Sequence, residues 1–524
     1  MSQEILQELS SLLGNDHVIT DDAERRYFTT DVYNSREMPL AVIRPGTVEE
    51  LQEAARIALK NNIALVPRGG GASYTDGYLP VTSQSLLVET SRLNRIVEIN
   101  ATDMYVTVEP AVTWERLNAA LAKEKLRTPF WGPFSGLKAT VGGSTSQNSA
   151  SMGSGNHGLS AESVLSFDVV LGNGKLLKTG SASISTSRPF FRWYGPDLTG
   201  LFTGDTGAMG IKARITLRLM RRPERTGTAS FGFDTFDDMA AGMSAVARLA
   251  VVADNYGLDP KLQQGQLTKT DTADAVRAVW NVARDSSNPL EAVSRLTRMA
   301  LAGKRFFAGF SHSAHYVVEG YSASEVKSKL KLVRETMRPH GTEIANTVPT
   351  VLRAMPFIPM YSVLGVKGER WVPLHGILPF SQVPEFRRRL MAMYEENADR
   401  MKDLRVDKGA MFMTINSNAF LYEPVFYWED SQTVFHKRFM PQDYLATLPE
   451  YDENPEGRAL VAELRQRILD IFWQVGATHL QVGKTYPYLR GRQPEAERLL
   501  REFKGSVDPN NLMNPGALGL GAES

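Results

Sequence analysis

The sequence of 524 residues contains no cysteine. This absence excludes disulfides, thiolate nucleophiles, iron–sulfur clusters and thiolate zinc sites. An excess of charge of one sign is also missing, because 59 Lys and Arg against 58 Asp and Glu leave a formal net charge of +1. A chain so balanced has no global field that would draw it to nucleic acid. Redox chemistry here would need a bound organic cofactor or a metal held by His and carboxylate ligands.

Long hydrophobic runs are absent as well. No apolar stretch approaches the roughly 20 residues that a membrane helix needs, and the N-terminus alternates acids with leucines instead of following a basic region with an apolar one. We therefore expect a cytoplasmic protein without a membrane span. The hydrophobic fraction of 42% over this length is enough for more than one core.

The first 225 residues predict strands and helices in alternation. Residues 41–44 form a short apolar run, and Thr47 with Glu50 makes a capping box that starts a helix. Residues 63–66 are again apolar and suit a buried strand. The segment is therefore predicted to be a β-α-β unit that ends in a glycine loop.

Two further stretches follow a boundary near residue 225. Residues 226–465 mix strand-like runs, such as 306–310, with amphipathic helices, such as 323–338, which is typical of an α+β domain. Residues 466–524 form a C-terminal segment that ends in many turn residues.

Three segments rich in glycine and small polar residues stand out. The first, residues 67–74, follows the predicted strand at 63–66 and contains three consecutive glycines, whose unshielded amides can point at an anion such as a pyrophosphate. The second, residues 140–158, has hardly a bulky side chain, so its backbone can lie against a flat ligand. The third, residues 194–211, again interleaves glycine with small polar residues. A flexible turn and a disordered linker are the alternatives for the first two.

In this order and at these separations, the three segments resemble the FAD-binding domain of the vanillyl-alcohol oxidase/p-cresol methylhydroxylase flavoprotein family. That family also contains D-lactate and glycolate dehydrogenases and alkyl-dihydroxyacetone-phosphate synthase. Residues 508–516, which read DPNNLMNPG, resemble the family's closing turn. The resemblance covers roughly residues 40–222 and 465–517.

The resemblance implies an α+β fold with a two-part FAD-binding domain of the p-cresol methylhydroxylase (PCMH) type. Residues 1–225 would form this domain, and residues 226–465 an α+β cap domain that selects the substrate. Residues 466–524 would return to the FAD domain and the active site.

The resemblance also implies FAD as the cofactor. In the family the glycine loop holds the pyrophosphate, the second segment runs beside the ribityl chain and the ring, and the third supports the adenine end. The residues so assigned are Pro67, Arg68, Gly69, Gly70, Gly71, Ala72, Ser73, Gly142, Gly143, Ser144, Asn148, His157, Gly158, Gly207, Gly210, Ile211 and Asn514. Members with covalent flavin use a His near the glycine loop, or a His or Tyr in the cap. The loop here carries Ala72 and Ser73, and residues 418–424 of the cap lack His, so we expect non-covalent FAD.

A metal site is not expected. The family's 2-hydroxy-acid dehydrogenases commonly show GHxGDGNxH in the cap and EHGxG near the end. The nearest stretches here, residues 371–376 and 479–484, supply no His pair at that spacing. A metal-assisted reaction on a hydroxy acid therefore loses support.

A phenolic substrate fits these departures better. In the phenol-oxidising members, two tyrosines and a cation hold the substrate as a phenolate while a hydride leaves toward flavin N5. The resemblance assigns these roles to Tyr74 and Tyr486, with Lys484 or Arg490 as the cation. A tyrosine among apolar neighbours is also a common core residue with a satisfied hydroxyl, and that interpretation stays open.

The catalytic base has several candidates. The acidic residue that vanillyl-type oxidases carry after the second segment is not found here, which leaves Glu423, His157 or His375. Each also has an ordinary structural interpretation: His375 as a satisfied core histidine, and Glu423 as the partner of a nearby cation.

The sequence thus predicts an FAD-dependent oxidase or dehydrogenase that acts on a CH–OH or benzylic CH group. It would transfer a hydride from a hydroxylated, para-substituted phenolic or benzylic small molecule to flavin N5, with oxygen or an electron carrier as the final acceptor. One alternative is a metal-free 2-hydroxy-acid dehydrogenase of the D-lactate or glycolate type. Another is a flavoprotein that uses FAD in a non-redox transfer or as a scaffold. Dimers are frequent in this family, so a homodimer is compatible with the resemblance.

Overall fold

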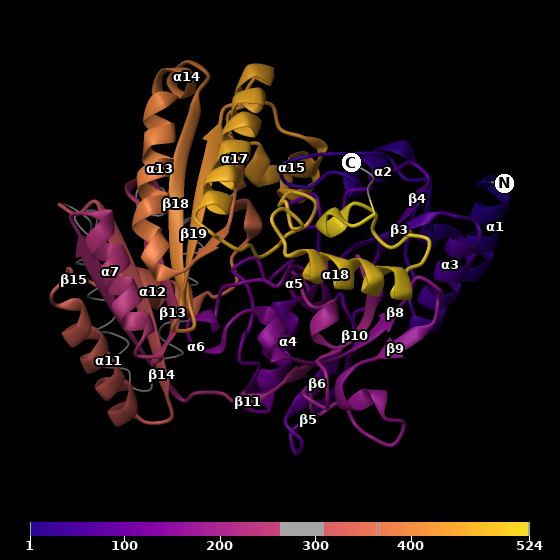
Figure 1. The fold of residues 1–524 in the computed structure, drawn as a ribbon, viewed down its shortest axis with the longest axis horizontal. Helices are drawn as coiled ribbons and strands as arrows, with labels where there is room; N and C mark the ends of the chain where they lie inside the picture. The colour runs from indigo at the N-terminus through magenta and orange to yellow at the C-terminus, as the bar shows by residue number, and fades with distance from the viewer. Residues whose placement is uncertain (1, 263–308, 363, 366, 522–524) are drawn as a thin grey trace.

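The computed structural model describes residues 2–262, 309–362, 364–365 and 367–521. Most of the strand-like run predicted at 306–310 lies outside the described residues. An N-terminal part holds two sheets, and a cap part is built on one large sheet (Figure 1). The end of the chain returns to the N-terminal part, as the yellow segment around α18 (Pro494–Val507) shows in Figure 1.

The first sheet has four strands in the order β1 (Val18–Ile19), β2 (Ala41–Ile43), β4 (Ser85–Glu89) and β3 (Ala64–Arg68). Strands β2, β4 and β3 are parallel. Helix α3 (Val48–Lys60) connects β2 to β3, and the Thr47 hydroxyl accepts a hydrogen bond from the Glu50 amide at 3.0 Å. The predicted β-α-β unit is confirmed, and the glycine loop leaves the carboxyl end of β3, where parallel sheets commonly bind ligands.

The second sheet is antiparallel and carries the other glycine-rich segments. Its order is β5 (Ile96–Asn100), β6 (Tyr105–Val108), β10 (Ile211–Arg218), β8 (Val164–Val170) and β9 (Leu176–Lys178). Helices α5 (Val141–Gln147) and α6 (Ser154–His157) lie in the second glycine-rich segment, and the third leads directly into β10. A small ribbon, β7 (Leu126–Arg127) with β11 (Met220–Arg221), precedes the cap.

The cap sheet has eight antiparallel strands. Its order is β15 (Thr342–Ile344), β12 (Arg225–Phe233), β14 (His312–Gly320), β13 (Val252–Leu258), β18 (Val406–Ile415), β19 (Ala419–Trp428) and β16 (Arg370–Pro373), and β17 (Gly376–Leu378) also pairs with β19. Helices α7 (Phe236–Ala247), α11 (Ala323–Met337), α13 (Val383–Glu396) and α17 (Pro455–Gln474) cover one face of this sheet (Figure 1). The helix predicted at 323–338 is thereby confirmed.

The remaining helices are shorter or lie at the margins of these layers. They are α1 (Ser2–Leu13), α2 (Asp22–Phe28), α4 (Trp114–Lys123), α12 (Thr347–Ala354), α14 (Ala398–Asp403), α15 (Val434–Phe439) and α16 (Gln442–Leu445).

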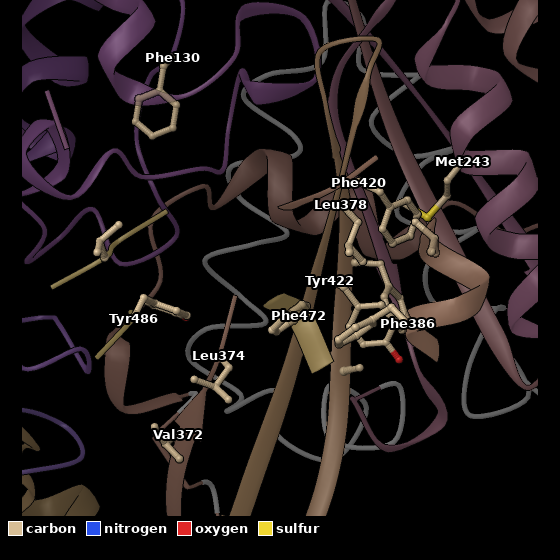
Figure 2. Close-up of a cluster of buried hydrophobic side chains, with 14 of the residues drawn as sticks. Phe130, Met243, Val372, Leu374, Leu378, Phe386, Phe420, Tyr422, Phe472 and Tyr486 are labelled. Atoms are coloured by element: carbon tan, nitrogen blue, oxygen red, sulfur yellow. The ribbon is translucent and has the colours of Figure 1, made fainter. Parts of the chain in front are cut away.

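Strand alternation divides the cap sheet into a core face and a cavity face. On β19, Tyr422 turns toward the helices and packs on Phe386 of α13, with ring centroids 4.9 Å apart. Phe386 stacks on Phe472 of α17 at 4.2 Å, and Figure 2 shows the three rings together. Glu423, the next residue on β19, points the other way, into a cavity that the glycine loop also lines.

The C-terminal segment contacts both parts, because Thr478 pairs with Ile377 of β17 in the cap and residues 512–514 pair with β3. The Leu65 amide of β3 donates to the Leu512 carbonyl at 2.7 Å, and the Asn514 amide donates to the Leu65 carbonyl at 2.8 Å. The boundary that the sequence placed at residue 465 falls inside α17, which is one continuous helix. The observed mixture of helices with parallel and antiparallel sheets agrees with the α+β class.

Candidate functional site

A cavity of about 990 Å³ lies between the N-terminal part and the cap. The glycine loop after β3, the segments around α5 and before β10, and the cavity face of β18 and β19 all contribute to its wall. Its volume is at the upper end of the range, roughly 300–1,000 Å³, that small-molecule and cofactor sites occupy.

The glycine loop presents unpaired amides to this cavity. Within the part of the chain that the structure describes, the backbone N–H groups of residues 69–73 have no hydrogen-bond partner. A Cβ on Gly70 would collide with the Lys138 carbonyl oxygen, and Gly71 has a φ of +70°. Only glycine tolerates the close approach at residue 70 and the positive φ at residue 71. The loop therefore holds free N–H donors at the cavity wall, as an anion site requires.

Besides Arg68 Nε, three buried polar atoms in the wall lack hydrogen-bond partners. They are Gln147 Oε1, Ser151 Oγ and the Tyr256 hydroxyl. A buried polar group without a hydrogen bond is costly, and the three lie along a cavity that a ligand could fill. The unpaired amides of the glycine loop fit the pyrophosphate of FAD. The unpaired polar groups further along the cavity wall fit the polar edges of its ring.

The cavity gathers most residues that the resemblance assigned to the cofactor. Those that line it are Pro67, Arg68, Gly69, Gly70, Gly71, Ala72, Ser73, Gly142, Gly143, Ser144, Gly207, Gly210 and Ile211.

Four assigned residues, Asn148, His157, Gly158 and Asn514, do not line the cavity. Asn148 ends α5 in the left-handed conformation, and its side chain accepts from the Ala161 amide at 3.2 Å. His157 closes α6 and is half-buried, and the adjoining Gly158 makes a left-handed turn. All three therefore shape the backbone behind the wall.

Asn514 holds two wall segments together from behind. Its Nδ2 donates to the Gly77 carbonyl at 2.8 Å and to the Thr206 carbonyl at 2.6 Å. Gly77 follows the glycine loop and Thr206 belongs to the third segment, and both line the cavity. Asn514 is thus a positioning residue for the cofactor site.

At the cap end, the cavity wall holds Tyr74, His375 and Glu423 in hydrogen-bond contact. The Tyr74 hydroxyl lies 3.1 Å from His375 Nε2, and the same nitrogen lies 2.8 Å from Glu423 Oε2. Tyr74 comes from the end of the glycine loop and Glu423 from β19, so the three side chains bridge the two parts of the molecule. Burial, with a further contribution from the Glu423 charge, raises the pKa of Tyr74 well above its usual value, so its hydroxyl stays protonated at neutral pH.

His375 owes its position to a break in the cap sheet. It lies between β16 and β17, where the pairing with β19 is interrupted, and side chains of the C-terminal segment bind its backbone instead. Its amide donates to the Tyr486 hydroxyl at 2.6 Å, and its carbonyl accepts from His479 Nδ1 at 2.7 Å. The His479 ring stacks on Tyr486, with centroids 4.3 Å apart.

This arrangement favours one tautomer of His375. The Tyr486 oxygen already accepts from the His375 amide, so its own proton is free to point to His375 Nδ1, 3.4 Å away. An imidazole that accepts at Nδ1 carries a proton on Nε2, which lies 2.8 Å from Glu423 Oε2 and 3.1 Å from the Tyr74 hydroxyl oxygen. Burial lowers the pKa of His479 to about 4, so that ring is neutral at neutral pH.

The phenol-binding roles expected for the C-terminal segment do not match its geometry. Tyr486 does not line the cavity and serves His375 instead. Lys484 does not line it either: its Nζ donates to Asn514 Oδ1 at 2.6 Å, and burial lowers its pKa to about 7. Arg490 forms an ion pair with Asp470 and lies over the Trp473 ring. None of these cations faces the site.

Several wall residues escaped the sequence analysis. Met411 and Met413 of β18, together with Tyr427 of β19, line the cap end, as do Trp371 and Gln481. The alternation of large residues along β18 and β19 carried a signal for the first three. The sequence carried no signal for Gln481, because its position at the cavity depends on how residues far apart in sequence come together.

Among the described residues, no three His, Asp or Glu side chains form a group that could hold a metal ion. No described helix is long and apolar enough to cross a bilayer.

Comparison with known proteins agrees with this architecture. Residues 39–180 match the family model described as "FAD binding domain". D-lactate dehydrogenase [cytochrome] 1 of Saccharomyces cerevisiae is 27% identical over 47% of this chain and 42% of its own length. The chain thus spans less than half the length of this curated relative.

Two solved structures share the fold over nearly the whole chain. A 4-ethylphenol oxidase from Gulosibacter chungangensis superposes with a TM-score of 0.74 at 18% identity, covering 99% of this chain and 97% of that one. A p-cresol methylhydroxylase superposes with a TM-score of 0.71 at 18% identity, covering 99% and 96%. The predicted PCMH-type fold is confirmed. The match over residues 39–180 and the fit of the cavity identify FAD as the cofactor of this chain.

Proposed function

We propose that this protein is an FAD-dependent oxidoreductase that oxidises a small, uncharged, hydroxylated aromatic molecule. The observation that carries the proposal is the continuous cavity, which runs from unpaired glycine-loop amides to the hydrogen-bonded Tyr74, His375 and Glu423. FAD, when bound, supplies the acceptor for two electrons. Membership of the vanillyl-alcohol oxidase/p-cresol methylhydroxylase family is part of the proposal.

In this proposal Glu423 takes the proton of the substrate hydroxyl. Its carboxylate lines the cavity, and the Nε2 proton of His375 orients it. The Tyr74 hydroxyl stays protonated and donates a hydrogen bond to the same substrate oxygen, which stabilises negative charge as it develops. Trp371, Met413 and Tyr427 line this end of the cavity and exclude water.

The charges in the wall support an uncharged substrate. The cationic side chains among the described lining residues are Arg68 and Lys212. Lys212 is paired with Asp205 at 2.5 Å, and Arg68 lies over the Phe28 and Tyr78 rings. A 2-hydroxy acid would need a cation for its carboxylate, and neither of these is free at the cap end. Similarity to a D-lactate dehydrogenase still makes such an acid the second candidate.

The test is anaerobic mixing of the holoprotein with 4-alkylphenols, 4-hydroxybenzyl alcohol or D-lactate while the visible flavin band is followed. Bleaching by the phenolic compounds is expected. Bleaching by D-lactate alone would overturn the choice of substrate, and a flavin that no compound bleaches, although dithionite does, would favour the non-redox alternative. Acid precipitation should release the flavin into the supernatant, because we propose that FAD is bound non-covalently.

A further inference from the structure

An exposed cluster of aromatic side chains lies on the loop that joins β9 to β10. We define the aromatic loop as residues 188–194, which read RPFFRWY. Phe190 is 53% exposed, Phe191 46%, Trp193 61% and Tyr194 67%. The third glycine-rich segment begins at Tyr194, yet residues 188–194 do not line the cavity, so the proposed function leaves them unexplained.

The loop is ordered by its own hydrogen bonds. The Ser181 hydroxyl donates to the Arg188 carbonyl at 2.6 Å and accepts from the Phe191 amide at 3.1 Å. The Ser181 amide donates to the Phe191 carbonyl at 2.8 Å. Arg192 is anchored by Asp197 at 2.8 Å and by the Ala161 carbonyl at 2.7 Å. The rings are therefore held in solvent by a fixed backbone, and such a patch marks an interaction surface.

The sequence around the aromatic loop is basic, although two of its cations are paired in space, Arg188 with Glu98 at 3.6 Å and Arg192 with Asp197 at 2.8 Å. Residues 175–196 contain Lys175, Lys178, Arg188 and Arg192 and no Asp or Glu. Lys175, Lys178 and Arg188 are exposed. This stretch is an exception in a chain whose charges balance overall, and it complements an anionic surface.

The shape and size of the cluster favour a lipid surface over a protein partner. A Cβ built on Gly195, next to the loop, would meet no atom within 4 Å, so this edge projects into solvent. A stable protein interface needs about 20–30 residues on each side, far more than one short loop offers. Trp and Tyr prefer the membrane–water interface, where their rings lie at the level of the headgroups.

We propose that the aromatic loop docks this protein on an anionic lipid surface, with Phe190, Phe191, Trp193 and Tyr194 in the interface and Lys175 and Lys178 facing the headgroups. The docking is peripheral and reversible, because a few rings and cations act together without a spanning segment. It requires neither the proposed reaction nor its substrate.

The test is co-sedimentation of the FAD-loaded full chain with phosphatidylcholine vesicles that contain or lack phosphatidylserine. The wild-type protein should sediment with the phosphatidylserine vesicles. The variant F190S/F191S/W193S/Y194S should lose at least about tenfold in affinity, and K175Q/K178Q should weaken binding several-fold, as should added salt. Trp473→Ser is the matched control, because Trp473 is 46% exposed far along the chain, on α17, and it should bind as the wild type does. Flavin content and the thermal midpoint show that each variant is folded.

Three results would overturn the proposal. The first is a wild-type protein that stays in the supernatant with both vesicles. The second is equal binding to vesicles with and without phosphatidylserine. The third, from analytical ultracentrifugation without lipid, is a wild-type dimer that the loop variant converts to a monomer, which would assign the patch to a protein interface.

Discussion

A carboxylate in the wall of an apolar cavity is costly unless a partner stabilises it. Glu423 has that partner in His375 at 2.8 Å, and His375 is in turn fixed through its backbone by Tyr486 and His479. The C-terminal segment therefore influences the proposed chemistry indirectly. It sets the orientation of the His375 imidazole, which in turn orients the Glu423 carboxylate.

Replacing Glu423 by Gln should slow substrate-dependent flavin reduction by about 10²- to 10⁴-fold, because the amide keeps the shape of the side chain but cannot take a proton. Affinity for FAD should be unchanged, since Glu423 lies at the cap end of the cavity. Stopped-flow absorbance under anaerobic conditions measures the rate. Glu429→Gln, which changes an exposed carboxylate paired with Arg405, is the control, and equal rates in the two variants would refute the assignment.

Residue chemistry could be predicted only in part. The sequence offered Tyr74, Glu423 and His375 as candidates, and the structure brings these three together. Tyr486 was expected to hold a substrate, but its hydroxyl accepts a backbone amide. Nothing in the local sequence could distinguish the two roles, because 111 residues separate Tyr486 from its partner His375.

At the scale of elements, the site depends on loops from distant parts of the chain that are held at fixed separations. Asn514 does this for two of them through the Gly77 and Thr206 carbonyls. Its Oδ1 also accepts from the buried Lys484 ammonium. One side chain thus binds two carbonyls and a cation. Lys484 also donates to the Asp76 and Gly77 carbonyls at 3.4 and 3.3 Å, so the Thr206 carbonyl depends most on Asn514.

Asn514→Ala should weaken FAD binding by about tenfold or more and lower the thermal midpoint, although Asn514 does not line the cavity. Each buried polar group left without a partner costs about 1–3 kcal/mol, and the two wall segments lose their common anchor. Titration of the apoprotein with FAD measures the affinity. Asn510→Ala changes an exposed position in the same turn and should leave the FAD affinity and the thermal midpoint unchanged. A similar loss of affinity in both variants would show that Asn514 does not position the cofactor site.

Local signals predicted individual elements well. Thr47 and Glu50 marked the start of α3, and amphipathic spacing marked α11, because caps and periodicity act over a few residues. Such local signals could not predict how the segments of the cavity wall are arranged. Residues 133–135, which line the cavity, contain two bulky or rigid side chains and break the small-residue pattern that identified the other segments.

At the scale of the whole molecule, the cores hold an unusual number of neutral histidines. Burial lowers the pKa of His157, His312 and His479 to about 4, and that of His315 and His436 to about 3. These five are uncharged at neutral pH in the folded protein. Four carboxyls oppose them: burial raises the pKa of Asp31 to about 7 and that of Asp259 to about 6, and it also raises the pKa of Asp168 and of Asp254.

The sign of the pH dependence follows from proton binding in the two states. Above pH 6.5 the histidines are neutral whether the chain is folded or unfolded. Between pH 6.5 and 4 the unfolded chain binds protons that the folded chain does not, so each histidine lowers the free energy of unfolding by about 1.4 kcal/mol per pH unit. Asp31 and Asp259 are protonated in the folded state in this window and offset part of the loss. Because the five histidines outnumber these four carboxyls, stability should fall from neutral pH to about pH 5.

Thermal midpoints followed by circular dichroism across this range measure the effect. His315→Gln should reduce the slope, because His315 is fully buried between the Ser230 and Ser313 hydroxyls and its removal leaves four such histidines. His340→Gln is the control and should leave the slope unchanged, since His340 is partly exposed at the end of α11. A midpoint that rises as the pH falls would mean that the four carboxyls dominate and that the buried histidines do not govern the acid stability of the fold.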